Sequence, residues 1–76
     1  MPLLRKLSGR ELVKILYNKF GFKALRQKGS HVILAKESDD GKIGCVVPLH
    51  PELKIGTLKG ILKQAKISEE DFSKFI

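Results

Sequence analysis

A run of apolar residues at helical spacing begins close to the N-terminus of the chain. Its members are Leu12, Ile15, Leu16 and Phe20. Ser8 followed by Glu11 three residues later is the capping-box pattern that begins a helix. Gly21 stands where a left-handed residue commonly ends one. The pattern therefore predicts an amphipathic helix over residues 9–20.

The following segment changes to patterns that are typical of β-strands. Residues 22–27 partly alternate, residues 31–36 are rich in β-branched and apolar side chains, and residues 42–47 form a third such run. Pro48 ends the third run, because proline cannot donate to a strand ladder. Turn-prone residues at 28–30 and 38–41 separate the runs. Because these connections are short, we expect an antiparallel meander.

A second helical pattern and a short final one complete the chain. Leu58, Ile61, Leu62 and Ala65 share one helical face, and Lys59, Lys63 and Lys66 lie on its flank. Ser68 begins a last turn or short helix, with Asp71 in the capping-box position and Phe72 and Phe75 available to close the core. The predicted order is α-β-β-β-α within a single domain over residues 1–76. This is an α+β fold with a three-stranded antiparallel sheet, helices on one face and the other face open.

The pattern of the second strand leaves the position of its first residue open. Val32 and Leu34 point to one side of the sheet, and His31, Ile33 and Ala35 point to the other. If the helices cover the side of Val32 and Leu34, His31 lies on the open face, whereas the opposite arrangement buries it in the core. Both sides are apolar, so periodicity favours neither arrangement. An open face that carries Ile33 would also suit a protein partner.

Composition adds a strong basic bias to this picture. The chain has 76 residues, 15 Lys and Arg against 8 Asp and Glu, and a formal net charge of +7. Nine of the basic residues but only one acid, Glu11, fall within residues 1–36. A basic bias of this kind on a folded domain favours a polyanionic partner, because neutralising phosphates releases counterions.

Several classes of function are disfavoured by the same sequence. The longest apolar run, Val32 to Ala35, is far short of the roughly 20 residues that a membrane helix needs, and the first ten residues lack a signal-peptide pattern. A single cysteine, Cys45, fits a reducing cytoplasm and is expected to be a small buried hydrophobe. No spacing resembles a zinc site, a P-loop or a dinucleotide fingerprint. We therefore expect a cytoplasmic protein with no metal, no cofactor and no membrane association.

Any catalytic chemistry is expected to centre on His31, because histidine is the usual general acid or base near neutral pH and the sequence has only two, His31 and His50. His31 follows a segment suited to phosphate: Arg26, Lys28 and Ser30 can hold phosphate oxygens, and Gly29 permits close approach of a ligand. Whether the loop that holds His50 lies at the same end of the sheet is left open.

RNA is a substrate that needs little from the protein, because its 2′-hydroxyl is an internal nucleophile beside the phosphorus. One histidine and a few cations suffice, and DNA, which lacks this hydroxyl, should be spared.

An ordered set of short motifs resembles one protein family. Leu7-Ser8-Gly9, Gly21-Phe22, Arg26 to His31, Val47 to His50, Leu53 to Leu58, and Ile61 to Ala65 are similar to the HicA-type (YcfA-like) mRNA interferase toxins. The similarity runs from about Leu7 to Phe72, and it departs from many relatives at Ile55, where they have proline.

This resemblance implies a fold like that of a double-stranded-RNA-binding domain and an endoribonuclease that cleaves mRNA and arrests growth. It also implies a HicB-type antitoxin that blocks the enzyme, and His31 as the catalytic histidine. The RNA-binding residues that we predict are Arg26, Lys28, Gly29, Ser30, Lys59 and Lys63. Two other functions remain open: a non-catalytic RNA-binding module of the same fold, and a domain that docks a protein through the open sheet face.

Overall fold

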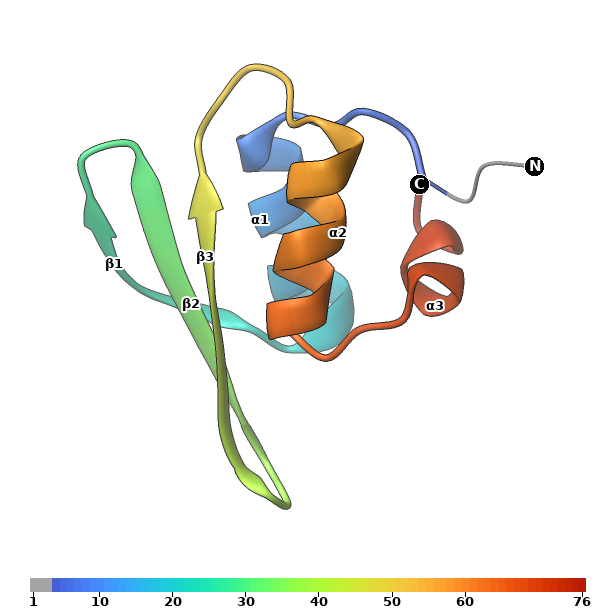
Figure 1. Ribbon diagram of the computed structural model, residues 1–76. Helices are drawn as coiled ribbons and strands as arrows, with labels where there is room; N and C mark the ends of the chain where they lie inside the picture. Colours follow the sequence, from blue (N-terminus) through green and yellow to red (C-terminus); the bar gives the residue numbers. More distant parts are fainter. Residues whose placement is uncertain (1–3) are drawn as a thin grey trace.

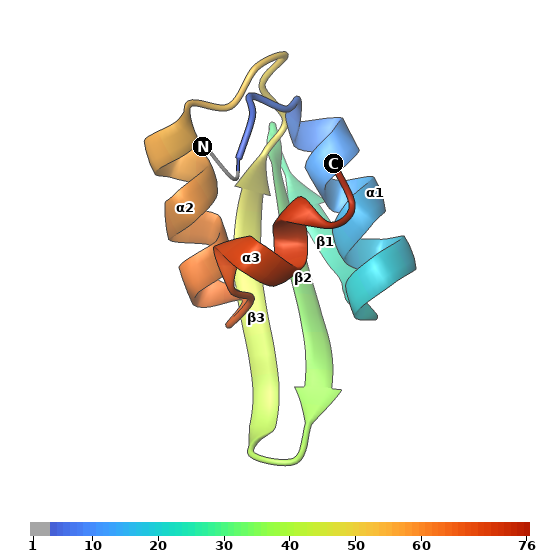
Figure 2. The same ribbon diagram turned by 90° about the vertical axis from the view of Figure 1, so that its right-hand side faces the viewer.

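The computed structural model describes residues 4–76 as three helices and one antiparallel sheet (Figure 1). In chain order the elements are α1 (Gly9–Phe20), β1 (Lys23–Lys28), β2 (His31–Ser38), β3 (Gly41–Pro48), α2 (Ile55–Gln64) and α3 (Glu69–Ser73). The strands lie in the order β1-β2-β3. All three helices lie on one face of the sheet and leave the other uncovered (Figures 1 and 2). The predicted α-β-β-β-α order and open antiparallel sheet are confirmed.

Helix α1 begins and ends through the local interactions that its sequence predicts. The Ser8 hydroxyl accepts the backbone N–H of Glu11 at 3.0 Å, and the Glu11 carboxylate accepts the backbone N–H of Ser8 at 3.0 Å. These reciprocal bonds satisfy two N–H groups that a helix N-terminus would otherwise leave free. Gly21 ends the helix at φ 77°, a left-handed conformation that costs glycine little. The predicted bounds, residues 9–20, are confirmed.

A second contact holds the C-terminus of α1 against the sheet. The Lys36 ammonium group on β2 donates to the carbonyl oxygen of Phe20 at 3.1 Å and lies 5.1 Å from the centre of the Phe22 ring. A cation is favoured there because the last carbonyl groups of a helix carry partial negative charge. Phe22 itself is fully buried. The join between α1 and β1 is therefore fixed by a side chain from the neighbouring strand.

One hydrophobic core lies between the helices and the covered face of the sheet. Its fully buried large side chains are Phe22, Phe72, Leu7, Leu12, Leu16, Leu34, Leu53, Leu58, Leu62 and Val47. Helix α3 supplies Phe72, but Phe75 does not close the core as expected. It stays 43% exposed and packs its ring edge-on against Phe20 at 5.3 Å. Phe75 lies beyond the end of α3 at Ser73, in a terminal turn whose backbone bonds include Phe75 N–H to the carbonyl oxygen of Phe72.

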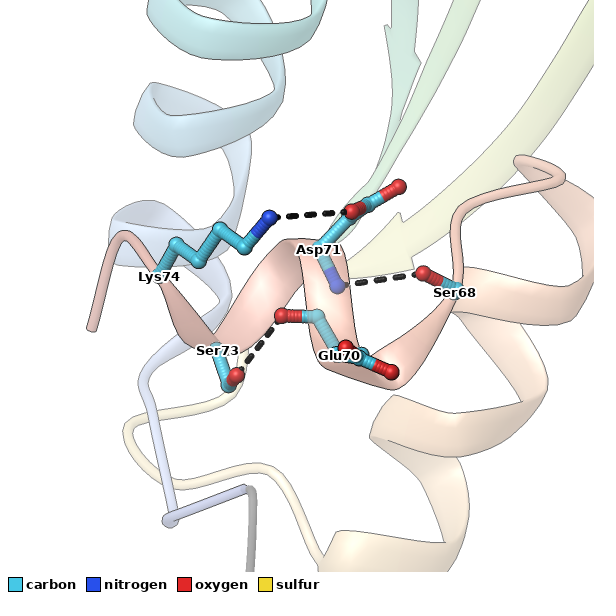
Figure 3. Close-up of polar contacts among 5 residues, drawn as sticks. All are labelled: Ser68, Glu70, Asp71, Ser73 and Lys74. Atoms are coloured by element: carbon cyan, nitrogen blue, oxygen red, sulfur yellow. Dashed lines mark hydrogen bonds and ion pairs between the residues drawn. The ribbon is translucent and has the colours of Figure 1, made fainter.

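Short polar contacts stabilise α3, which is only five residues long (Figure 3). The Ser68 hydroxyl accepts the backbone N–H of Asp71 at 3.0 Å, which confirms Ser68 as the residue that begins this helix. At the other end the Ser73 hydroxyl donates to the carbonyl oxygen of Glu70 at 2.7 Å. Lys74 forms an exposed ion pair with Asp71. These contacts stabilise the short helix that carries Phe72, whose side chain is fully buried in the core.

Three backbone hydrogen bonds tie the loops together at the end of the sheet where β2 begins. Each bond runs from a backbone N–H to a backbone carbonyl oxygen. The pairs are Leu49 to Ser30 at 2.6 Å, Gly9 to His50 at 2.9 Å, and Leu53 to Leu7 at 2.6 Å. Gly9 is needed at this contact, since a Cβ there would lie 2.1 Å from the carbonyl oxygen of Pro48. The start of α1, the β1–β2 turn and the loop after β3 thus form one packed end of the molecule.

Within residues 4–76, no helix combines the length and the apolar character that a membrane span requires.

Candidate functional site

The structure decides which side of β2 faces the helices. Val32 and Leu34 are buried within the core, at 7% and 0% exposure. His31 is exposed, and Ile33 is half-buried. Ala35 is buried at 6% exposure but lies outside the core cluster. Because side chains alternate along a strand, His31, Ile33 and Ala35 belong to the face that no helix covers.

Basic residues of β1 flank His31 on this open face. Lys28 and His31 are direct partners in the β1–β2 register, and on its other side His31 is paired with Pro48. The next row of the same face pairs Arg26 with Ile33. Directly paired residues of an antiparallel ladder share a face, and successive rows on one face are about 7 Å apart. Lys28 and Arg26 therefore stand beside the histidine and one row along from it.

The turn before His31 is tight and exposed. Lys28 and His31 are paired across two residues, Gly29 and Ser30, which is the shortest common hairpin connection. Gly29 has φ 61° and Ser30 does not have a positive φ, the pattern of a type II′ turn with glycine first. The Gln27 side-chain amide donates to the carbonyl oxygen of Gly29 at 2.9 Å, which orders the turn further. The predicted residues Gly29 and Ser30 are thus held next to His31 by the backbone.

The two histidine-bearing segments converge at one end of the sheet, a point that the sequence left open. The bond from Leu49 to the carbonyl oxygen of Ser30 joins the β1–β2 turn to the loop after β3. His50 follows in that loop, where its side chain is exposed and its carbonyl oxygen accepts the N–H of Gly9. The backbone of His50 therefore anchors α1.

Lys59 and Lys63 occupy a different part of the molecule from His31. Both are on α2, which lies on the covered side of the sheet. They line a shallow groove of about 410 Å³ together with Ser68 and Glu69 of the α3 segment. The structure brings Arg26, Lys28, Gly29 and Ser30 to His31, and it does not bring Lys59 and Lys63 there.

A basic residue of β1 on the open face was missing from the predicted set. Lys23 is paired with Ala35 and so belongs to the same face as Arg26 and Lys28. The register shifts between Ala24 and Arg26, which makes Leu25 an extra residue on β1. This bulge interrupts the alternation of β1, so the three cations are not spaced by two residues throughout. If β1 alternated strictly, Lys23 would lie on the opposite face from Arg26 and Lys28. The sequence pattern therefore did not place Lys23 with them.

Cys45 has the structural role that was expected of it. Its side chain is 4% exposed and belongs to the core cluster. Burial raises the pKa of the Cys45 thiol to about 11 by disfavouring the charged thiolate. A thiol in that state is a poor nucleophile at neutral pH. In the part of the chain that the structure describes, no three His, Cys, Asp or Glu side chains gather closely enough to hold a metal ion.

The fold and the site define a small basic α+β domain with an exposed histidine on a helix-free sheet face. Residues 9–67 match the family model described as the HicA toxin of bacterial toxin–antitoxin systems. The match spans more than half of the chain, and the chain therefore belongs to the HicA toxin family. Membership implies an antitoxin partner. No curated protein and no solved structure matches the chain.

Proposed function

We propose that this HicA-family toxin is an mRNA interferase, an endoribonuclease that cleaves single-stranded mRNA with His31 as its catalytic group. The observation that carries the proposal is the placement of His31 on the open sheet face, exposed and paired directly with Lys28. Arg26 lies one row further along the same face. A general acid–base group beside cations is the arrangement that phosphodiester cleavage requires.

The proposed reaction uses the nucleophile that RNA carries. The 2′-oxygen attacks the adjacent phosphorus and loses its proton, while the bond from phosphorus to the 5′-oxygen breaks and that oxygen gains a proton. His31 accepts the first proton or donates the second, and water exchanges the other. Lys28 and Arg26 stabilise the negative charge that grows on the phosphate oxygens. The products are a 2′,3′-cyclic phosphate and a free 5′-hydroxyl, and the reaction requires no metal ion or cofactor.

The open face also suits an extended single strand. Lys28, Arg26 and Lys23 line the β1 side of that face, where they can contact successive phosphates. Beside them on the same face lie Ile33 of β2 and its partner Val46 of β3, the latter 40% exposed. This apolar strip offers contact to bases, whereas the turn residues Gly29 and Ser30 leave room for backbone approach.

In the cell this activity would act in the cytoplasm, where mRNA is translated, and it would arrest growth. A HicB-type antitoxin would bind the toxin and prevent cleavage until the antitoxin is lost. Lys59 and Lys63 remain predicted RNA contacts outside the face of His31. DNA would not be cleaved, because it lacks the attacking hydroxyl.

The proposal is tested by incubating the purified protein with a single-stranded RNA oligonucleotide in EDTA. We expect cleavage that leaves 2′,3′-cyclic phosphate and 5′-hydroxyl ends, and we expect a DNA oligonucleotide of the same sequence to stay intact. Cleavage of the DNA, or products that carry 5′-phosphates, would contradict the internal 2′-hydroxyl mechanism.

A non-catalytic RNA-binding module is the second candidate, because the same row of cations would hold RNA whether or not it is cleaved. Both candidates have a steep dependence of affinity on salt concentration, so binding alone does not separate them. Tight binding that leaves the RNA intact after long incubation would favour the binding module. If the open face instead docks a protein, we expect the domain to have no affinity for RNA at low salt.

A further inference from the structure

A groove runs between α1 and β1 along one edge of the sheet. It consists of two adjoining hollows of about 600 Å³ and 440 Å³, which share the lining residues Val13, Lys14 and Ala24. The first hollow extends to Leu25 and Leu49, and the second extends to Tyr17 and Leu34. The floor of this groove lies on the covered side of the sheet, and Arg26 and Lys23, which belong to the open face, reach only its rim.

The groove exists because β1 does not fill the space beneath α1. All six residues of β1 are exposed, in contrast to the partly buried β2 and β3. Ala24 is paired with Leu34 and therefore faces α1, and its short side chain lines both hollows. Beside this groove Tyr17 and Leu25 are 60% and 58% exposed. Two large apolar side chains exposed beside one groove indicate a surface that a partner covers.

Basic residues form the rim of this groove. Arg10 and Lys14 come from α1, and Lys23 and Arg26 come from β1. The acidic residue there, Glu11, already accepts the backbone N–H of Ser8. A partner that complements this surface has apolar side chains for the floor and carboxylates for the rim.

The strand edge favours a peptide over RNA as the occupant. β1 is the first strand of the sheet and, among residues 4–76, has a strand neighbour only on the side of β2. An extended peptide can pair its backbone with such an edge, and its side chains then alternate between the two faces of the sheet. One set would enter the apolar groove, and the other would meet Lys23 and Arg26 on the open face. RNA has no backbone that continues a β-ladder.

We propose that this groove and the free edge of β1 dock an extended segment of the antitoxin in which apolar and acidic residues alternate. The segment lies alongside β1, with its apolar side chains against Tyr17 and Leu25. Its carboxylates contact the basic rim. The proposal concerns binding alone and does not depend on the reaction that the toxin catalyses.

The test is calorimetric titration of toxin variants with the purified cognate antitoxin, in the absence of RNA. Leu25→Asp and Tyr17→Asp place a carboxylate where an acidic, apolar segment would lie. We expect each substitution to raise the dissociation constant for the antitoxin at least tenfold, as the loss of a central interface contact does. Thr57→Asp and Lys54→Glu, at the start of α2, are matched controls, because both sites are exposed and line neither part of the groove. We expect both controls to bind like the original chain.

Each outcome decides the proposal once far-ultraviolet circular dichroism shows that a variant is folded. Unchanged affinity of the two groove variants overturns it, and so do equal losses in groove variants and controls. A DNA oligonucleotide serves as an uncleavable nucleic-acid ligand. If a groove variant loses affinity for this DNA but keeps its affinity for the antitoxin, the groove binds nucleic acid and the proposal is wrong. If the toxin alone is a dimer that Leu25→Asp dissociates, and the affinity for the antitoxin is unchanged, the groove binds a second copy of the toxin and the proposal is wrong. Slowed hydrogen exchange of β1 amides in the complex supports strand addition, whereas unchanged exchange there overturns it.

Discussion

The backbone N–H of Leu49 donates to the carbonyl oxygen of Ser30 at 2.6 Å. This bond joins the loop after β3 to the turn that carries His31, and it fixes the end of the sheet on which the proposed site is built. Gly9 adds a second attachment through the carbonyl oxygen of His50. The start of β2 is therefore tied to the loop after β3, while the His31 side chain stays exposed.

The cations of the open face should matter more for RNA binding than those of α2. Lys28→Gln and Arg26→Gln remove charge beside His31, so we expect each to weaken binding and to reduce the slope of affinity against salt by about one unit. Lys63→Gln, in the groove beside α3, is the matched comparison. The measurement is fluorescence anisotropy of a labelled single-stranded DNA oligonucleotide over a range of salt concentrations. If Lys63→Gln reduces the affinity and its salt dependence more than Lys28→Gln does, the main nucleic-acid-binding surface includes α2 and not the open face.

Gly9 should tolerate no side chain, because a Cβ at this position would lie 2.1 Å from the carbonyl oxygen of Pro48 and 2.7 Å from the Cα of Leu49. We expect Gly9→Ala to lower the free energy of unfolding by about 1–3 kcal/mol, as overpacking does. Gly60→Ala is the control: it lies inside α2 with nothing within 4 Å of the added Cβ, and alanine there should stabilise by about 0.5–1 kcal/mol. Urea unfolding measures both. Equal stability of Gly9→Ala and the original chain would contradict the packing of α1 on the β3 loop.

The capping box predicts a specific pH dependence of stability. Hydrogen bonds from the backbone and side chain of Ser8 lower the pKa of Glu11 below its ordinary value. A lowered pKa in the folded state means that the ionised carboxylate stabilises the fold near neutral pH. This contribution is lost as the pH falls through the lowered pKa of the folded protein. The urea midpoint of the original chain should therefore exceed that of Glu11→Gln near pH 7, and the difference should shrink in acid. A difference that is constant with pH would show that the charge of Glu11 has no role.

Cys45 should react slowly in the folded protein. Because burial raises the pKa of its thiol to about 11, the thiolate that reacts with thiol reagents is scarce at pH 8. We expect labelling by a disulfide reagent to be much slower in buffer than in concentrated urea, where the thiol is exposed. Comparable rates in the two conditions would show that the β3 core opens readily or that Cys45 is not buried.

Local signals in the sequence predicted the helices and strands well, whereas the placement of the site required the structure. Ser8, Glu11 and Gly21 predict the ends of α1 because capping acts over three or four residues of the same segment. The side on which His31 lies was undecided, because Ile33 and Val32 make both faces of β2 apolar. Only the packing of the helices on Val32 and Leu34 resolves it.

Two further features of the site depend on register, which no local pattern encodes. The extra residue at Leu25 brings Lys23 onto the same face as Arg26, and the sequence shows no sign of it. The same irregular strand leaves the α1–β1 groove open. Lys63 looks equivalent to Lys28 in sequence, since both are exposed lysines, but they occupy different parts of the fold. Charge could be counted from the sequence, but it could not be assigned to a surface.

The most direct test of the proposed function compares the single-turnover cleavage rate of RNA by the original chain with the rates of His31→Ala and His50→Ala. Both side chains are exposed, so neither replacement should unfold the protein. If His31 transfers the proton, its replacement should slow cleavage by about 10²- to 10⁴-fold, whereas His50→Ala should cleave at nearly the original rate. Equal cleavage by His31→Ala and the original chain would remove His31 from the mechanism.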